Sequence, residues 1–333
     1  MNMFSKKKTS KFLIKSLLFL VILFFLDYFI GFALNYFYFK QDSGYLYRTT
    51  YAMNSTKAEI LIFGSSTANH HYYPSSFEER MNNSVYNTGR DGNTVFYNYA
   101  VLQSVLKRYT PKIAILDVNF QEFKKEPTSY DRLSSLLPYY RTHPYVKPII
   151  QLRSPYEKYK FLSKIYPFNS LIFGIVAGNS EYNKSRENIN DEKGYIPLTK
   201  IWNQPIGVNN KHVKYSLDSN KIHFFNEFIR NCVTANVKLY LVVSPRFSRE
   251  KFEDSSLIIA KQIATESNIP FFDFSKDAEF LHNGSLFADI GHLNDKGAKI
   301  FSNKVIDHIL QYQLQHPMNF IDLQQEINQK TKK

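Results

Sequence analysis

Short apolar runs that alternate with helical patterns constrain the fold of this 333-residue chain more than any other feature. Each run is as long as one buried β-strand, and the helical stretches are long enough to cross back over a sheet. The expected strands are 58–63, 84–86, 113–116, 238–243 and 270–274, and the expected helices are 93–109, 220–234, 250–266 and 295–311. Such alternation predicts an α/β fold with a doubly wound parallel sheet, which we place in residues 58–313.

The first 40 residues stand apart from this pattern. Residues 1–15 are basic, with lysines at positions 6, 7, 8, 11 and 15, and residues 16–39 are apolar or aromatic apart from Asp27 and Asn35. About two dozen such residues can cross a hydrocarbon core about 30 Å thick. The run is longer than the apolar part of a typical signal peptide, and no Ala-x-Ala cleavage site follows it. A transmembrane helix over 16–39 is therefore favoured over a cleaved signal peptide.

The lysines also predict the orientation of this helix. Positive residues gather on the cytoplasmic side of a membrane span, so residues 1–15 are expected in the cytoplasm and the rest of the chain outside it. The protein would then be a single-pass protein of the cell membrane, with residues 40–57 as a linker to the first strand. Asp27 inside the span could mark a contact with a membrane protein partner, or be tolerated without a role.

A candidate catalytic triad lies where such a fold binds ligands. Ligands of open α/β sheets bind beyond the carboxyl ends of the strands, and the first strand ends in Gly64-Ser65-Ser66-Thr67. Far downstream, Asp289 stands three residues before His292, just ahead of the last helix. We expect Ser66 to be the nucleophile and His292 its general base. Asp289 would fix the imidazole tautomer and stabilise its charged form.

Each half of this triad also has a purely structural explanation. Ser65 and Ser66 could be turn residues after a strand. The loop before the last helix could only cap that helix, with Asn294 or Asp295 as the N-cap residue. The two halves together, in the right order and on the right elements, favour catalysis.

With these residues in place, the sequence resembles the SGNH or GDSL hydrolase family, which carries four short sequence blocks in a fixed order. Gly64-Ser65-Ser66 matches the nucleophile block, with Ser65 in place of the usual Asp. Asp289-Ile290-Gly291-His292 matches the last block. The resemblance therefore assigns the nucleophile and the base to the same residues as the strand-end argument.

The second and third blocks concern the oxyanion hole. The resemblance places the second block after the second strand, with Gly92 as the expected oxyanion-hole glycine and Gly89 as the alternative. The third block departs from the family, because 117–120 reads Asp-Val-Asn-Phe and not Gly-x-Asn-Asp. Asn119 is therefore the weaker candidate, and the backbone amides of Ser66 and Gly92 could form the hole alone.

The resemblance implies a flavodoxin-like strand order and a serine acyl-ester hydrolase or O-acyltransferase that needs no cofactor. Its substrates would be esters, such as acetyl groups, on cell-surface polysaccharide or lipid. The family includes membrane-anchored members such as the D-alanyl transfer protein of teichoic acid synthesis. Water and a sugar hydroxyl both remain open as acyl acceptors. The departure in the third block leaves one alternative, a non-catalytic SGNH-like binding or scaffold protein that assists a membrane acyltransferase.

Composition and charge argue against other kinds of partner. The net charge of +13 comes partly from residues 1–15 and from the polar, basic tail 314–333. The remaining lysines are scattered and no nucleic-acid motif is present, which favours an anionic lipid or polymer over nucleic acid. Cys232 is the only cysteine, so there is no disulfide framework. His70 and His71 are adjacent and expected to point apart, so no metal site is predicted.

Residues 124–215 interrupt the strand–helix alternation with short helical stretches rich in Tyr and Pro. This insertion follows the third strand, so we expect it to fold over the carboxyl edge of the sheet as a cap. Its tyrosines and Trp202 could stack on sugar rings, although aromatic residues more often serve the core. The tyrosines concerned are Tyr139, Tyr140, Tyr145, Tyr156, Tyr159 and Tyr166. Residues 181–193 are polar and are expected to form a loop.

Overall fold

The computed structural model describes residues 3–180, 193–203, 215–247, 254–281 and 283–316. Its strands form one parallel sheet of five strands in the order β2-β1-β3-β4-β5. The strands are β1 (Ile60–Phe63), β2 (Val85–Asn87), β3 (Ile113–Asp117), β4 (Lys238–Val243) and β5 (Phe271–Asp273). This order confirms the doubly wound, flavodoxin-like sheet expected from the sequence.

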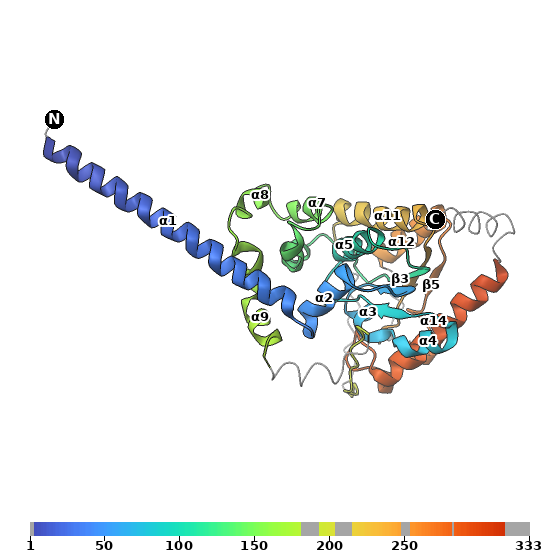
Figure 1. Cartoon of the computed structure of the whole chain (residues 1–333). Helices are drawn as coiled ribbons and strands as arrows, with labels where there is room; N and C mark the ends of the chain where they lie inside the picture. Colours follow the sequence, from blue (N-terminus) through green and yellow to red (C-terminus); the bar gives the residue numbers. More distant parts are fainter. Residues whose placement is uncertain (1–2, 181–192, 204–214, 248–253, 282, 317–333) are drawn as a thin grey trace, which may run out of the picture.

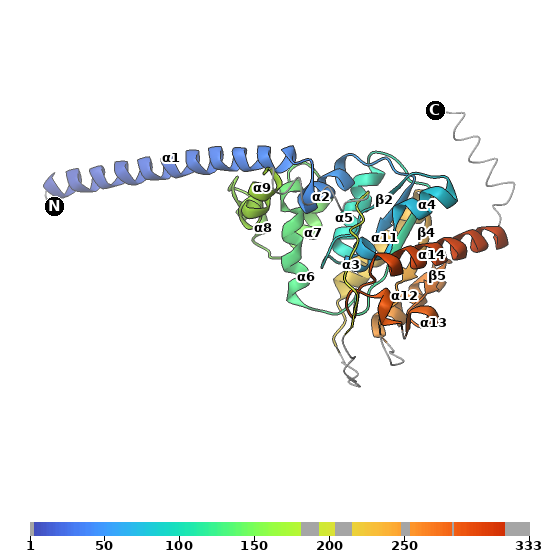
Figure 2. The same ribbon diagram turned by 90° about the horizontal axis from the view of Figure 1, so that it is seen from below.

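Helices cover both faces of the sheet, as the continuous burial of β1 and β3 requires. Leu61 and Phe63 pack on one face, under α5 (Val95–Leu106), α11 (Ser219–Thr234) and α12 (Ser255–Glu266). Ile60 and Ile62 pack on the other face, under α3 (Ser66–His71), α4 (Pro74–Met81) and α14 (Asp295–Gln315). Two short helices, α13 (Ala278–Leu281) and η3 (Gly284–Leu286), precede α14. Successive residues of one strand therefore belong to two separate hydrophobic layers (Figures 1 and 2).

Side-chain caps set the ends of several helices. The Asp254 carboxylate accepts hydrogen bonds from two backbone N–H groups at the start of α12, and the first residues of the helix expected at 250–266 lie outside the described ranges. Asn294 caps α14, since its side chain accepts from the N–H of Gly297 at 3.0 Å. Asn294 is thus the N-cap residue of the last helix, one of the two candidates considered.

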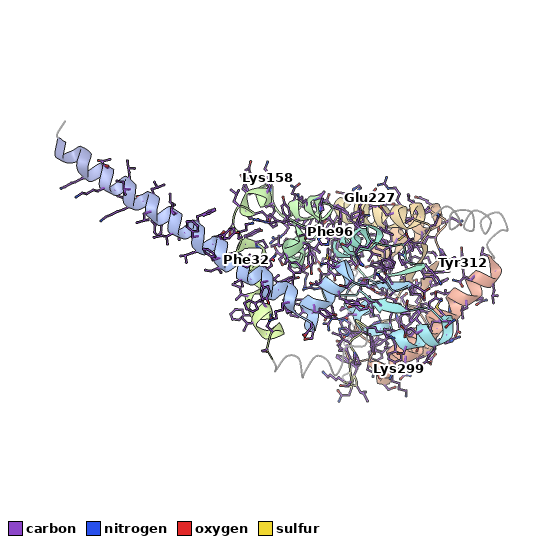
Figure 3. All side chains as sticks on the ribbon, in the orientation of Figure 1. Phe32, Phe96, Lys158, Glu227, Lys299 and Tyr312 are labelled. Atoms are coloured by element: carbon purple, nitrogen blue, oxygen red, sulfur yellow. The ribbon has the colours of Figure 1, made fainter. Side chains whose placement is uncertain are left out.

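A single helix, α1 (Met3–Lys40), forms the N-terminal part of the chain and projects away from the α/β domain (Figure 1). Its segment Lys8–Lys40 is long and apolar enough to cross a membrane, and a stretch of 18 residues within it has a mean hydropathy of 2.6. Between Lys8 and Leu26, every residue except Ser16 is exposed. Figure 3 shows the side chains of this part pointing outward from the helix on all sides. This exposed apolar surface is what a lipid-facing helix presents.

The expected linker at 40–57 is not a loose connection, because most of it forms helix α2 (Gly44–Asn54). Leu46, Ala52 and Met53 of α2 are buried in the same hydrophobic layer as α5. Thr49 is buried as well, and the spacings of three and four residues from Leu46 to Thr49 and from Thr49 to Met53 place these side chains on one helical face. The segment is therefore part of the domain.

The insertion forms short helices and turns, as expected, but most of it packs beside α1, α2 and α5 and not over the sheet edge. The helices are α6 (Pro127–Asp131), η1 (Arg132–Tyr139), α7 (Val146–Gln151), α8 (Glu157–Lys160), η2 (Tyr166–Leu171) and α9 (Ile172–Gly178). In the described part of the insertion, the segment that crosses the carboxyl edge is 193–203, where the Ile196 N–H donates to the carbonyl oxygen of Asn69 at 3.0 Å. The cap is therefore this short segment.

Most of the tyrosines singled out in the insertion are packing residues. Tyr139 is fully buried and its hydroxyl hydrogen-bonds the Tyr38 hydroxyl at 3.1 Å. Tyr140 stacks on Phe161 with ring centroids 3.6 Å apart. Tyr156 and Tyr159 are exposed, on the part of the insertion that flanks α1. Burial, and not sugar stacking, explains the buried members of this set.

Asp27, the acidic residue of the apolar helix, has its partners within the chain. Its carboxylate accepts hydrogen bonds from the hydroxyl of Ser163 and from the N–H of Lys164 at 2.7 Å. One turn further along α1, Gly31 lies against the backbone of Lys164, where a Cβ atom would collide with it. The second half of α1 is therefore docked on the insertion.

Two segments discussed from the sequence fall outside the described ranges. They are residues 181–192, nearly all of the polar loop, and residues 317–333, nearly all of the tail.

Candidate active site

Ser66 lies immediately beyond the carboxyl end of β1, as the first residue of α3. The turn that joins them needs a glycine. Gly64 has φ of +150°, and a Cβ atom there would lie 2.6 Å from the Cβ of Ala68. The N–H groups in the first turn of a helix have no acceptor within that helix. The sharp turn thus places the Ser66 hydroxyl at the carboxyl edge of the sheet, where such folds bind ligands. The N–H groups of the first turn of α3 lie next to it.

Ser66, His292 and Asp289 form a continuous chain of hydrogen bonds. The Oγ of Ser66 lies 2.7 Å from Nε2 of His292, although the two residues are 226 positions apart. Nδ1 of His292 lies 2.9 Å from both carboxylate oxygens of Asp289. Nδ1 donates to the carboxylate, so Nε2 is the acceptor for the Ser66 hydroxyl. The structure brings the three predicted residues together in the order nucleophile, base and acid.

The loop that carries His292 is held by Asp289 itself. One oxygen of Asp289 accepts from the N–H of Gly291 at 2.8 Å and from the N–H of His292 at 2.9 Å. Partial burial raises the pKa of Asp289, but hydrogen bonds from His292 and Gly291 outweigh it, and the pKa lies below its ordinary value. Asp289 is therefore ionised at neutral pH and faces the ring of His292, where a negative charge would stabilise an imidazolium.

His71 supports the same loop from behind. Its Nε2 accepts a hydrogen bond from the N–H of Leu293 at 2.9 Å. Complete burial, together with the charges of His292 and His70, holds the pKa of His71 well below its ordinary value. His71 is thus neutral and positions the residue next to His292. The sequence offered no signal for this role.

His70 also lies against the His292 ring, with ring centroids 5.6 Å apart, and the centroid of the His71 ring is 6.1 Å from that of His292. The expectation that these adjacent histidines point apart is therefore wrong: α3 sets both rings edge-on against one imidazole. No group of His, Cys, Asp and Glu side chains in the described ranges is arranged to hold a metal ion.

His70 makes a second histidine–aspartate pair. Its Nδ1 lies 2.7 Å from the carbonyl oxygen of Ile196, and its Nε2 lies 3.3 Å from Asp91. The side-chain amide of Asn69 donates to Asp91 at 2.8 Å. Partial burial raises the pKa of Asp91, but the contacts from His70 and Asn69 outweigh it and lower the pKa to about 2. This pair ties α3 to the loop after β2.

The two glycines proposed for the oxyanion hole differ in what engages them. The N–H of Gly89 donates to the side chain of Asn87 at 2.9 Å, and a Cβ on Gly89 would lie 2.8 Å from that of Ala68. Gly92 has φ of +66°, and its N–H meets no acceptor among the described residues. Its outer side is covered by the guanidinium of Arg132. Gly92 therefore keeps an unused donor, whereas Gly89 is a packing residue.

Asn119 contacts Thr67, the residue after Ser66, and its side-chain amide is not a free donor. Its Oδ1 accepts from the hydroxyl of Thr67 at 2.7 Å, and its Nδ2 lies 3.3 Å from an oxygen of Glu122. The amide that would stabilise an oxyanion is thus engaged by a carboxylate. This arrangement favours a hole made of two backbone amides, those of Ser66 and Gly92.

A buried carboxylate that the sequence analysis did not single out lies under the site. Asp117, at the end of β3, accepts hydrogen bonds from the hydroxyls of Thr67, Ser244 and, at 2.6 Å, Tyr72. Complete burial raises the pKa of Asp117 to about 6, against the three hydroxyls that lower it. Its position directly after a predicted strand is the same signal that identified Ser66, so the sequence contained it.

The structure is similar to those of known esterases and lipases. No protein-family model matches the chain, and no curated protein matches its sequence. An acetyl xylan esterase shares 14% sequence identity with a TM-score of 0.38, over 75% of this chain and 99% of that protein. A GDSL-like lipase from Bacteroides thetaiotaomicron shares 8% identity with a TM-score of 0.36, over 76% and 88%.

Proposed function

We propose that this protein is a serine acyl-ester hydrolase or O-acyltransferase of the SGNH type. The observation that carries the proposal is the hydrogen-bonded chain from Ser66 through His292 to Asp289. It ends on a hydroxyl at the carboxyl edge of a doubly wound sheet, where this fold binds ligands. A serine that only ended a strand would not need an imidazole nitrogen 2.7 Å from its hydroxyl.

The reaction follows from the direction of these hydrogen bonds. The Oγ of Ser66 attacks the ester carbonyl carbon while its proton passes to Nε2 of His292, and Asp289 stabilises the resulting imidazolium. The N–H groups of Ser66 and Gly92 bind the oxyanion. Collapse of the intermediate breaks the ester C–O bond, and the imidazolium protonates the leaving alcohol. Water or an acceptor hydroxyl then attacks the acyl-enzyme by the same steps in reverse.

Helix α1 supports a membrane location for this chemistry. Its exposed apolar part follows a basic N-terminus, so we propose that residues 1–15 are cytoplasmic and that the α/β domain lies outside the cytoplasm. The substrates would then be esters of cell-surface polysaccharide or lipid. A reporter enzyme that is active only outside the cytoplasm should be active when it is fused after Lys333. Activity of a reporter that works only inside the cytoplasm, fused at the same position, would refute the orientation.

One observation favours the non-catalytic alternative. The Asn119 amide is bound to Glu122, so the third donor of a complete oxyanion hole is occupied. A scaffold protein that assists a membrane acyltransferase could keep the fold with such a site. The two proposals differ in whether Ser66 reacts.

A fluorophosphonate probe applied to the full-length chain in detergent tests that difference. We expect the wild type to be labelled and to hydrolyse p-nitrophenyl acetate, and Ser66→Ala to do neither. Ser65→Ala is the matched control, since Ser65 is the adjacent hydroxyl and lies outside the hydrogen-bonded chain. Labelling of Ser66→Ala at the wild-type level would refute the catalytic role. Loss of labelling in Ser65→Ala alone would show that the nucleophile is one residue earlier.

A further inference from the structure

A cavity of about 440 Å³ lies beside the triad and is lined by three arginines. It is enclosed by α2, by the loop after β2 and by the start of η1, and its lining includes Arg48, Arg90, Arg132, Tyr45, Tyr97 and Asp91. Asn69 and Asp91 belong to this lining and also contact each other next to His70, whose ring lies against His292. The cavity therefore adjoins the catalytic histidine.

The carboxylate that lines this cavity does not neutralise the positive charge of Arg90 and Arg132. Its single lining carboxylate, Asp91, already contacts His70 and Asn69. Within the described ranges, neither Arg90 nor Arg132 forms an ion pair with a carboxylate. Guanidinium groups that share one partly enclosed cavity repel each other unless an anion lies between them. The cavity is thus suited to a negatively charged ligand.

Arg90 is held in place without a carboxylate. Its guanidinium donates to the hydroxyl of Thr49 and lies over the rings of Tyr45 at 5.4 Å and Tyr97 at 5.8 Å. The hydroxyl of Thr49 is also 3.2 Å from that of Tyr97. Stacking on aromatic faces leaves the N–H edge of a guanidinium available, so Arg90 is pre-oriented for an incoming anion.

Arg132 connects the cavity to the loop after β2, which contains Gly92. Its guanidinium covers Gly92, the residue whose N–H we assign to the oxyanion hole, and its side chain is otherwise exposed. Arg132 comes from the insertion, which joins the sheet just after β3. An anion held by Arg132 would therefore lie next to the loop that stabilises the reaction's oxyanion.

We propose that this arginine-lined cavity binds a phosphate group of the ester substrate and so directs the acyl ester to Ser66. A phosphate group presents its oxygens in a tetrahedral arrangement, so two guanidinium forks can approach it from different directions, whereas the two oxygens of a carboxylate lie in one plane. The cavity volume leaves room for the polyol to which the phosphate is attached. This inference rests on the proposed esterase function and adds a substrate class to it.

Binding to a catalytically dead protein tests the site without turnover. In full-length Ser66→Ala in detergent, titration calorimetry should show sn-glycerol 3-phosphate binding and glycerol not binding. Adding Arg132→Gln should weaken phosphate binding about tenfold or more, with Arg132→Lys intermediate because it keeps charge without the fork. Arg230→Gln on α11, whose arginine pairs with Glu227, is the control and should change nothing. Equal binding in the Arg132 and Arg230 variants would overturn the proposal.

Arg90→Gln supplies a second variant, checked by its melting temperature because Arg90 also packs on two tyrosines. The ratio of kcat/KM for an acetyl ester of glycerol phosphate to that for acetylglycerol should exceed ten in the wild type and fall in both arginine variants. A ratio near one would overturn the phosphate site while leaving the esterase intact. Phosphate binding without hydrolysis of either ester would refute the esterase and keep the site.

Lipid and soluble phosphates are separated by competition. Nanodiscs of phosphatidylglycerol that displace sn-glycerol 3-phosphate, where phosphatidylcholine nanodiscs do not, would identify a lipid headgroup as the source. Failure of both to compete would identify a soluble or polymeric phosphate. Equal displacement by both lipids would contradict recognition of negative charge.

Discussion

Two histidine–aspartate pairs lie side by side, with the ring centroids of His70 and His292 5.6 Å apart. Only one of the two histidines has a ring nitrogen next to the Ser66 hydroxyl. In the pair His292–Asp289, the carboxylate takes Nδ1 and leaves Nε2 to accept from Ser66. In the pair His70–Asp91, the second nitrogen faces the carbonyl oxygen of Ile196. Both nitrogens of His70 therefore face acceptors, and neither is left to take a hydroxyl proton.

The two pairs contain the same residue types and differ in what the second ring nitrogen contacts. That contact, and not the residue types, distinguishes a candidate catalytic pair from a structural one. His292 belongs to a loop fixed by the N–H bonds to Asp289, with its far nitrogen directed to α3. His70 is part of α3 itself, with its ring turned towards segment 193–203. In the function we propose, His292–Asp289 does the chemistry, and His70–Asp91 forms the wall between the triad and the arginine-lined cavity.

Replacement of each histidine should give the largest difference in kcat between the two pairs. His292→Ala deletes the general base, so kcat on p-nitrophenyl acetate should fall by about 10⁴ to 10⁶. His70→Gln keeps a hydrogen-bonding side chain on the same helix and should cost about tenfold or less. Steady-state kinetics of both variants, with melting temperatures near that of the wild type, measures the contrast. Similar losses in the two variants would mean that His70 takes part in proton transfer.

Replacement of each carboxylate by an amide should give a smaller contrast. Asp289→Asn removes the charge that stabilises the imidazolium and can hold the wrong tautomer, so kcat should fall by about 10² to 10⁴. Asp91→Asn should lower kcat less than tenfold on a neutral ester. If the loop with Asp289 only capped α14, Asp289→Asn would keep most of the activity, and the triad would have to be abandoned.

Asp117, a buried carboxylate without a histidine, should give the smallest effect, and one on stability. Because burial raises its pKa from 3.8 to about 6, the folded protein keeps the proton longer than the unfolded chain does. The free energy of unfolding therefore falls by roughly 2–3 kcal/mol as the pH rises from about 4 to about 6. Above about pH 6 the titration of Asp117 changes it no further.

The variant Asp117→Asn cannot titrate, so its melting temperature relative to the wild type should rise by about 3–6 °C between pH 4 and pH 7. Thermal unfolding of both full-length proteins in detergent measures this shift. Asp307→Asn, at an exposed position on α14, is the control and should show a much smaller change. A pH-independent difference between Asp117→Asn and the wild type would contradict the raised pKa.

Much of the fold was predictable because its signals are local. The apolar runs gave the five strands, and helix patterns between them gave α5, α11 and α14 to within a few residues. The positions of Ser66, Asp289 and His292 followed from strand ends and from a resemblance carried by short motifs. Each of these signals lies within a few neighbouring residues.

What the sequence did not show depends on contacts between distant segments. The hydrogen bond from the Leu293 N–H to His71 joins the loop that carries His292 to α3, across more than 200 positions of sequence. The arginine-lined cavity combines α2, the β2 loop and the insertion, none of which has a periodic pattern that marks the others. The docking of the insertion on Asp27 likewise appears only when α1 is packed.

That docking changes how the enzyme would search for substrate. A domain on a flexible tether samples a volume set by the length of its linker, and longer linkers lower its effective concentration at the membrane. Here Gly31 and Asp27 fasten the anchor helix to the domain, and α2 continues directly into it. With α1 as the membrane anchor that we propose, the fold would fix the height of Ser66 above the bilayer. Encounters depend on lateral diffusion in two dimensions, and only esters presented at that one height come within reach.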